Sequence, residues 1–197
     1  MCMSDNLEIA ENQQERLDEK WLVGFTDGEG TFSISFIKNE SMRFGYQIFT
    51  EFVVTQGEKS LDVLAKIEKF FGCGRIYVNR RYDNHKENIY RYCVRSRKDL
   101  LAIVIPFFGK HQLLTAKKND FKIFSEVVEM MEKREHLSEK GFGKIKNLAS
   151  QTNRQKKRLE SSTTDTLESQ KSDKTQSELY GDVEVIAEYT EITIKTN

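Results

Sequence analysis

Alternating polar and apolar positions predict two antiparallel hairpins, each preceded by a helix. The first strand is expected over residues 31–37, where Phe32, Ile34 and Phe36 alternate with threonine and serine. The second is expected over residues 46–56, beyond a turn at 38–41 that is extended if Gly45 takes part. We assign to the core the more apolar face of this strand, formed by Tyr46, Ile48, Thr50, Phe52 and Val54.

A second unit of the same kind follows. Large apolar residues at helical spacing predict a helix over residues 59–71, which glycines end. Strands are expected over 75–80 and 89–94, joined by a polar loop at 81–87. The facing of the last strand stays open, because both of its faces carry apolar residues: Tyr90, Tyr92 and Val94 on one, Ile89 and Cys93 on the other.

Three further helices are predicted downstream. The first covers residues 98–105 and is expected to stop at Pro106, the only proline, because proline disrupts a helix interior. A long helix follows over 115–133, and a short one over 138–148, with Ser138 as a candidate N-cap. The order of elements therefore predicts an α+β domain built from a repeated helix–strand–strand unit, with helices at its end.

Composition divides the chain into three parts. Residues 1–14 are polar and are expected to be flexible, 15–150 form the folded domain, and 151–197 read as a disordered polar tail. Residues 182–195 could form a strand, but nothing in the sequence shows what it would pair with. No segment approaches the roughly 18 apolar residues of a membrane span, and no secretory or Arg-rich transit signal is present. Three cysteines without CxxC spacing favour a reducing compartment and disfavour a zinc site.

The net charge of zero conceals an uneven distribution. Residues 21–150 hold 22 basic against 16 acidic side chains, an excess of six, whereas both ends of the chain are acidic. The bases cluster between Arg75 and Lys98. Such a cluster is either a solvated surface or a binding surface for phosphates.

The segment W-L-V-G-F-T-D-G-E-G at residues 21–30 combines features that local propensity disfavours. Its apolar residues predict a helix, beginning near Glu15, that is wrapped in protein. Gly24 and Gly28 each cost about 1 kcal/mol in a helix, and their spacing lets another backbone approach closely. Glu29 falls at the negative end of the helix dipole, where a cation such as Mg²⁺ would make a carboxylate favourable. A plain helix end with surface acids is the alternative.

This ten-residue segment resembles the defining motif of the LAGLIDADG homing endonucleases, and we find no second copy. The resemblance implies an αββαββα fold with a saddle-shaped antiparallel sheet, and a homodimer that packs through Trp21, Gly24, Phe25 and Gly28. It implies Mg²⁺-dependent cleavage of double-stranded DNA at a near-palindrome of about 20 bp. Glu29 and the Gly28 carbonyl would be the metal ligands.

Two further segments carry the resemblance. V-T-Q at 54–56 is similar to single-motif endonucleases of algal organelles, which implies that Gln56 helps to hold the nucleophilic water. The segment P-F-F-G-K-H-Q-L-L-T-A-K-K-N-D-F at 106–121 resembles the family's second motif and aligns the family's catalytic lysine with Lys117. Lys118 is the alternative. Taken alone, these residues read as a polar strand end and a solvated lysine pair.

The outward face of the predicted sheet offers groups that hydrogen-bond base edges in a major groove, although a solvated face would look the same. The candidate DNA contacts are Ser33, Ser35, Asn39, Gln47, Glu51, Thr55, Arg75, Tyr77 and Asn79.

Alternatives on the same scaffold are an RNA maturase with intron RNA as its partner, a DNA-binding protein that does not cleave, and a metal-free structural dimer. The resemblance implies an organelle-encoded protein of a chloroplast or mitochondrion, or otherwise a cytoplasmic protein of a prokaryote.

Overall fold

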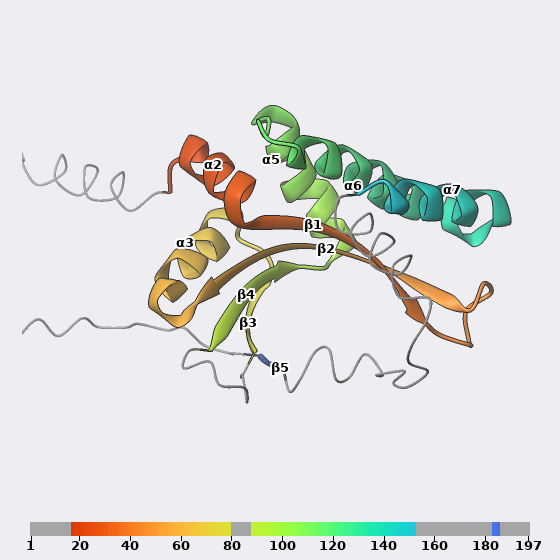
Figure 1. Ribbon diagram of the computed structural model, residues 1–197, viewed down its shortest axis with the longest axis horizontal. Helices are drawn as coiled ribbons and strands as arrows, with labels where there is room; N and C mark the ends of the chain where they lie inside the picture. Colours follow the sequence, from red (N-terminus) through yellow and green to blue (C-terminus); the bar gives the residue numbers. More distant parts are fainter. Residues whose placement is uncertain (1–16, 80–87, 153–182, 186–197) are drawn as a thin grey trace, which may run out of the picture.

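The computed structural model describes residues 17–79, 88–152 and 183–185. The N-terminal segment, the loop predicted at 81–87 and most of the C-terminal tail lie outside the described residues. Within the described part, two helix–strand–strand units form one antiparallel sheet, and helices cover one face of it (Figure 1). The α+β fold predicted from the sequence is confirmed.

Each unit begins with a helix that leads into a hairpin. The first consists of α2 (Glu19–Glu29), β1 (Gly30–Lys38) and β2 (Tyr46–Gly57). The second consists of a 3-10 turn (Glu58–Ser60), α3 (Leu61–Phe71), β3 (Arg75–Asn79) and β4 (Ile89–Val94). The strand order is β1-β2-β4-β3-β5, where β5 is Val183–Val185 in the predicted tail and pairs with β3.

The register decides the facing that the sequence left open for β4. Val54 of β2 lies opposite Tyr92, so Tyr90, Tyr92 and Val94 face the core and Cys93 faces away from it. The tyrosine at the centre is tolerated in the core because its hydroxyl donates to the Cys73 carbonyl at 2.7 Å. Burial raises the pKa of this phenol far above its ordinary value, so it remains a donor.

Pro106 does not end its helix, contrary to the prediction. A short helical turn (α4, Arg97–Asp99) continues into a π-helical turn (Leu100–Val104) and then into α5 (Ile105–Lys110). In the widened turn the Ile105 N–H donates to the Leu100 carbonyl, five residues back. Pro106 therefore lies in the first turn of α5, where the lack of an N–H costs little.

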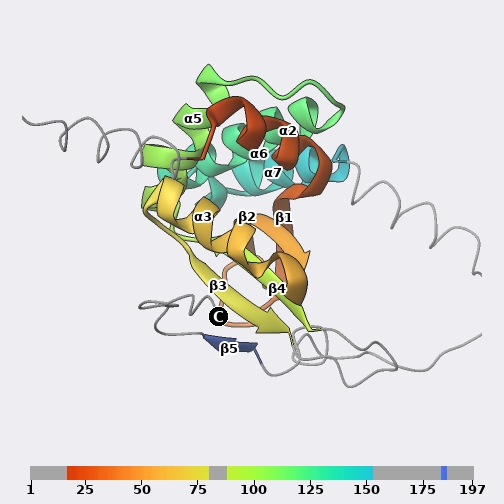
Figure 2. The ribbon, with the colours of Figure 1, turned by 90° about the vertical axis from the view of Figure 1, so that its left-hand side faces the viewer.

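The remaining helices pack on the same side of the sheet as α2 and α5 (Figures 1 and 2). They are α6 (Lys117–Glu132), a 3-10 turn (Glu135–Leu137) and α7 (Glu139–Ser150). The Ser138 hydroxyl accepts from the Gly141 N–H at 3.0 Å, so its prediction as an N-cap is confirmed. Among the described residues, no helix has the length and apolar character needed to cross a membrane.

The core lies between the helices and one face of the sheet. Phe32 of β1 is central to it, because its ring lies 5.1–5.5 Å from the rings of Phe52, Phe108, Phe121 and Phe124. We call the opposite face of the sheet the polar face. It carries Ser33, Ser35, Gln47, Glu51, Thr55, Arg75, Tyr77, Arg91 and Cys93. No described helix packs on it.

The turn between α3 and β3 depends on a glycine. Gly74 has φ +85°, and a β-carbon there would lie 2.7 Å from the Tyr92 ring and 2.8 Å from the Cys93 carbonyl oxygen. We expect Gly74→Ala to lower the free energy of unfolding by more than about 2 kcal/mol. Gly143→Ala, at an exposed position of α7 with open space, should raise it by up to about 1 kcal/mol. Chemical denaturation measures both, and equal stability of Gly74→Ala and the wild type would contradict this account.

Candidate active site and nucleic-acid interface

The candidate active site is built at the junction of α2 and β1. Asp18 caps the start of α2 by accepting from the Trp21 N–H at 2.8 Å, and Glu29 is its last residue. Gly30 opens β1 with an ordinary φ of −74°, so it is needed for space rather than for a left-handed turn. A β-carbon there would lie 2.6 Å from the Thr26 methyl. This close contact lets the chain pass from helix to strand directly, with Glu29 exposed at the junction.

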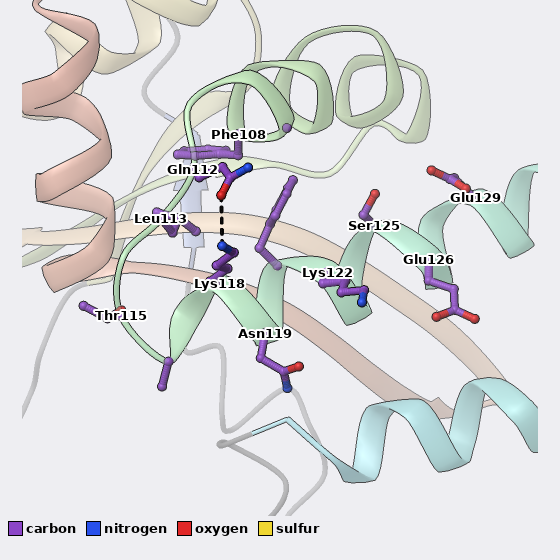
Figure 3. A pocket seen from close by; sticks show the side chains of 13 residues that line it. Phe108, Gln112, Leu113, Thr115, Lys118, Asn119, Lys122, Ser125, Glu126 and Glu129 are labelled. Carbon is purple, nitrogen blue, oxygen red and sulfur yellow. Dashed lines mark hydrogen bonds between the residues drawn. The ribbon is translucent and has the colours of Figure 1, made fainter.

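Lys117, at the start of α6, reaches the same junction. Its ammonium donates to the Thr26 carbonyl at 2.9 Å and to the Gly28 carbonyl at 3.2 Å. Burial lowers the pKa of Lys117, while the charges of Asp27, Glu29 and Asp120 oppose that shift. Lys118 instead donates to the Gln112 side chain at 2.9 Å (Figure 3). The structure thus brings Lys117, and not its neighbour, to Gly28.

Asp27 holds this arrangement together, a role that the sequence did not reveal. Its carboxylate accepts from the Leu114 N–H at 2.7 Å, the Thr115 N–H at 3.3 Å and the Thr115 hydroxyl at 2.7 Å. The Thr115 hydroxyl also accepts from the Lys117 N–H at 3.2 Å. Burial raises the pKa of Asp27, but these hydrogen bonds and the charge of Lys117 outweigh it and lower the pKa overall. The loop before α6 is therefore fastened to α2 by one charged side chain.

Gln56 lies at the same end of the sheet. Val54 pairs with Gly30 across the β1–β2 ladder, and Gln56 follows two residues later. The register therefore brings the predicted water-positioning residue to the side of the sheet where α2 ends. The cavity beside the α5–α6 loop, about 690 Å³ in volume, is separate: its lining includes Lys118 and Phe121 but neither Glu29 nor Lys117 (Figure 3).

The donors at the junction fit a hard divalent cation. The Glu29 carboxylate and the Gly28 carbonyl are oxygen ligands, which Mg²⁺ and Ca²⁺ prefer. The Gly28 carbonyl already accepts from an ammonium, so it points toward positive charge. No group of three or more His, Cys, Asp and Glu side chains gathers in the part of the chain that is described. The two oxygens of Glu29 and Gly28 alone are too few to complete the coordination shell of such an ion.

One side of α2 has no partner within the described chain. Leu22 and Thr26 are buried, whereas Trp21 is 42% exposed and stacks on Phe25 with ring centroids 4.7 Å apart. β-carbons built at Gly24 and Gly28 would meet nothing within 4 Å. The expectation of a fully wrapped helix is therefore wrong for the single chain. The predicted dimer residues instead lie on a half-apolar side of α2 that has room for another backbone.

The polar face collects several of the predicted DNA contacts. The Ser33 and Ser35 hydroxyls lie 3.4 Å apart, Gln47 and Arg75 are exposed, and Thr55 and Tyr77 are half-buried. Asn39 lies apart from this group, in the β1–β2 turn, where its side chain accepts from the Ser41 N–H and hydroxyl. The backbone of Asn79 ends β3, and its side chain lies outside the described residues.

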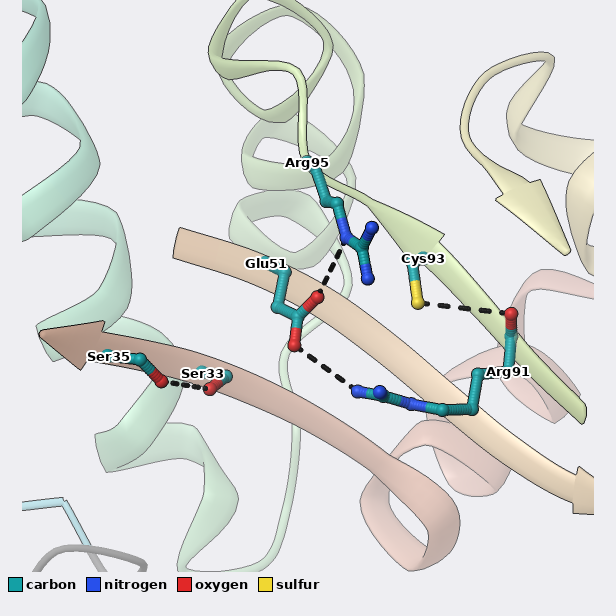
Figure 4. A network of polar contacts seen from close by, with 6 residues as sticks. All are labelled: Ser33, Ser35, Glu51, Arg91, Cys93 and Arg95. Atoms are coloured by element: carbon teal, nitrogen blue, oxygen red, sulfur yellow. Dashed lines mark hydrogen bonds and ion pairs between the residues drawn. The ribbon is translucent and has the colours of Figure 1, made fainter. Parts of the chain in front are cut away.

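Glu51 requires a correction. It was expected among the exposed groups that contact bases, but its side chain is 3% exposed. Its carboxylate accepts from Arg91 Nη2 at 3.2 Å and from Arg95 Nε at 3.0 Å (Figure 4). The reason is that two guanidinium groups flank this carboxylate on the sheet face. The carboxylate accepts its hydrogen bonds from them and not from solvent. The sequence showed only a basic cluster here, and no periodicity pairs residues 40 and 44 positions apart.

Comparison with known proteins identifies the family. The model of the LAGLIDADG endonuclease family matches residues 22–128, more than half of the chain. "Probable intron-encoded endonuclease 2" of Neurospora crassa is 31% identical over 125 residues, which are 64% of this chain and 25% of that protein. The chain spans about a quarter of the length of the first fungal relatives that it matches.

Solved structures share the fold. The homing endonuclease I-TnaI has a TM-score of 0.62 and 39% identity, over 74% of this chain and 97% of that one. I-SmaMI, bound to an uncleaved DNA target in the presence of calcium ions, has a TM-score of 0.65 and 32% identity. That match covers 76% of this chain but 49% of I-SmaMI.

The role of Asp27 can be tested through stability. We expect Asp27→Asn to lower the free energy of unfolding at neutral pH by about 1–3 kcal/mol, because an acceptor of three hydrogen bonds loses its charge. The folded pKa of Asp27 lies below the ordinary 3.8. Its contribution is therefore complete above that pH and is lost as the pH falls through the lowered value. The gap between variant and wild type should close in acid.

Asp62→Asn is the matched control. Asp62 lies on α3, its side chain is 67% exposed, and it is 4.0 Å from Lys66, so the substitution should change stability little at any pH. Urea denaturation curves between pH 2 and 7 measure both variants. Equal losses in the two variants, or a deficit of Asp27→Asn that does not change with pH, would contradict the fastening role.

Proposed function

The chain belongs to the LAGLIDADG endonuclease family, and from this premise we propose that it is a homing endonuclease that cuts double-stranded DNA as a homodimer. The observation that carries the proposal is the convergence of Glu29, the Gly28 carbonyl and the Lys117 ammonium at the end of α2. A carboxylate, a carbonyl and a partly desolvated cation at one exposed point suit the hydrolysis of a phosphodiester, whose transition state gathers negative charge.

Glu29 and the Gly28 carbonyl would hold a divalent ion, for which we propose Mg²⁺. When bound, this ion activates water and neutralises charge on the scissile phosphate. The calcium ions in the I-SmaMI complex support divalent metal chemistry in this fold. Lys117 stabilises the developing charge on the phosphate or gives a proton to the leaving oxygen, and its lowered pKa favours proton release. The Gln56 amide orients the attacking water.

The homodimer places two such junctions side by side. The α2 surface with Trp21 and Phe25 at one end and Gly24 and Gly28 along it would pack against its own copy around a two-fold axis. This chain aligns with nearly all of the I-TnaI chain and with about half of the I-SmaMI chain. These two coverages support the idea that two such units form one nuclease. Each polar face would then lie along one half-site, which gives a near-palindrome of about 20 bp.

The names of the relatives support a setting within introns. Several fungal matches are described as intron-encoded, and we propose that this gene is an open reading frame inside an intron, in an organelle or in a prokaryote. The DNA to test first is therefore the host gene with the intron removed, because a homing enzyme cuts the uninterrupted site.

The catalytic assignment predicts different effects for neighbouring residues. Glu29→Gln should bind the intronless duplex as the wild type does and fail to cut it, because it keeps the shape but loses the metal ligand. Lys117→Met should slow cleavage by about 10²–10³-fold, the usual effect of removing one charge-stabilising group. Lys118→Met is the matched control and should cut at nearly the wild-type rate.

Cleavage of the duplex in Mg²⁺ and gel-shift binding in Ca²⁺ measure these effects. Cleavage by Glu29→Gln would remove Glu29 from the site, and a slow Lys118→Met with a normal Lys117→Met would reverse the assignment of the lysines. Tight binding of intron RNA by a wild-type protein that cuts no DNA would favour a maturase instead.

The dimer surface predicts a separate effect. Gly24→Leu adds a side chain where the single chain has open space, so it should leave the folded monomer intact while preventing close approach of two α2 helices. We expect sedimentation to give a dimer for the wild type and a monomer for Gly24→Leu, with loss of double-strand cleavage. Gly109→Ala, at a glycine on α5 that also has open space, should stay dimeric. A dimeric and active Gly24→Leu would refute this interface.

A further inference from the structure

Arg95 is held on the polar face by three neighbours from two strands. Its Nε donates to Glu51 of β2 at 3.0 Å. Its guanidinium lies 4.6 Å from the ring centroid of Tyr77 on β3 and 5.5 Å from that of Phe49 on β2. A long side chain that stacks on two rings and bonds a buried carboxylate has lost most of its rotamer freedom before any ligand arrives.

Glu51, the carboxylate that holds Arg95, is unusually buried for a charged residue on a sheet face. Its side chain is 3% exposed, and it bonds Arg91 and Arg95 through separate oxygens. Desolvating a carboxylate is costly, so a chain that needed only positive charge here would do better without it. What the carboxylate adds is direction, because each oxygen fixes one guanidinium (Figure 4). Arg95 keeps 32% of its side chain exposed, so part of it is accessible on the polar face.

The two terminal nitrogens of Arg95 carry the donors that Glu51 does not use. The Cys93 thiol also lies beside the guanidinium. Burial, together with the charge of Glu51, raises the pKa of this thiol to about 11, so it stays neutral and is a weak acceptor. A forked pair of N–H donors in a fixed orientation matches the O6 and N7 acceptors of guanine in a major groove. The two arginines and Glu51 together carry a net charge of only +1, which favours directional bonding over attraction to phosphate.

We propose that Glu51 presents the guanidinium of Arg95 to a guanine of the bound DNA, so that Arg95 determines specificity and Glu51 is its positioning residue. The inference rests on the proposed function, since it requires a duplex along the polar face. The position also fits. Glu51 lies on β2 and Arg95 directly follows β4, and both are inner strands of the sheet, where a duplex would bring base edges rather than its outer phosphates.

Selection of bound duplexes from a randomised pool in Ca²⁺, followed by sequencing, tests the assignment. The wild type should enrich sites with guanine at one fixed position of each half-site. Arg95→Lys keeps the charge but loses the fork, and it should lower the preference for guanine at that position by about 5- to 150-fold, leaving other positions unchanged. Glu51→Gln should weaken the preference at the same position, because the amide turns a donor toward one of the two guanidinium groups.

Arg97→Lys is the matched control, because Arg97 bonds the Met131 carbonyl of α6 instead of the polar-face network. It should select the wild-type sequence. An Arg95→Lys protein that keeps the guanine preference, or loses affinity equally for all sequences, would overturn the proposal in favour of a phosphate contact. Thermal melting checks that each variant is folded. If Glu51→Gln does not fold, the selection with Arg95→Lys alone decides whether Arg95 reads a guanine. Failure of the wild type to select any sequence would instead refute the proposed function.

Discussion

The concentration of negative charge at the end of α2 is the constraint around which this structure is arranged. The helix dipole, Asp27 and Glu29 all place negative charge at one point, which is unfavourable unless cations or donors lie nearby. Groups 87 to 91 residues away in the sequence supply them: the Leu114 and Thr115 amides bond Asp27, and Lys117 bonds the carbonyls of the last turn. Glu29 remains exposed, and the partial neutralisation leaves it available to a further cation.

The alternation of side chains along the strands separates the two faces of the sheet. Strict alternation sends Phe32 and Phe52 into a shared aromatic core, and this fixes the register of β1 on β2. The register in turn fixes which residues meet on the polar face, and it places Glu51 within reach of two arginines. The core and the arrangement of the polar face are therefore two consequences of one pairing. A one-residue slip would destroy both.

The sequence predicted what depends on local pattern and missed what depends on distant partners. The strands, the Ser138 cap and the core face of β2 follow from periodicity and capping preference, which act within a few residues. The prediction at Pro106 was wrong because no residue type indicates the π-helical turn that precedes it. The partners of Asp27 and Glu51 lie 40 to 88 residues away, and only the folded register brings them together. Lys117 was singled out only because its place in a family motif substitutes for that missing information.

The unpartnered side of α2 joins these features to function through electrostatics. If two copies pack across Gly24 and Gly28, their Glu29 carboxylates approach each other. At a separation of about 6 Å, two such charges repel by roughly 1–3 kcal/mol, depending on how wet the site is. Burial of Trp21 and Phe25 between the two copies would oppose this repulsion without removing it. A divalent cation does remove it, so assembly of the dimer, binding of metal and binding of the phosphate backbone stabilise one another. In the proposed dimer, the active site would thus be complete only in the presence of the second copy and the DNA.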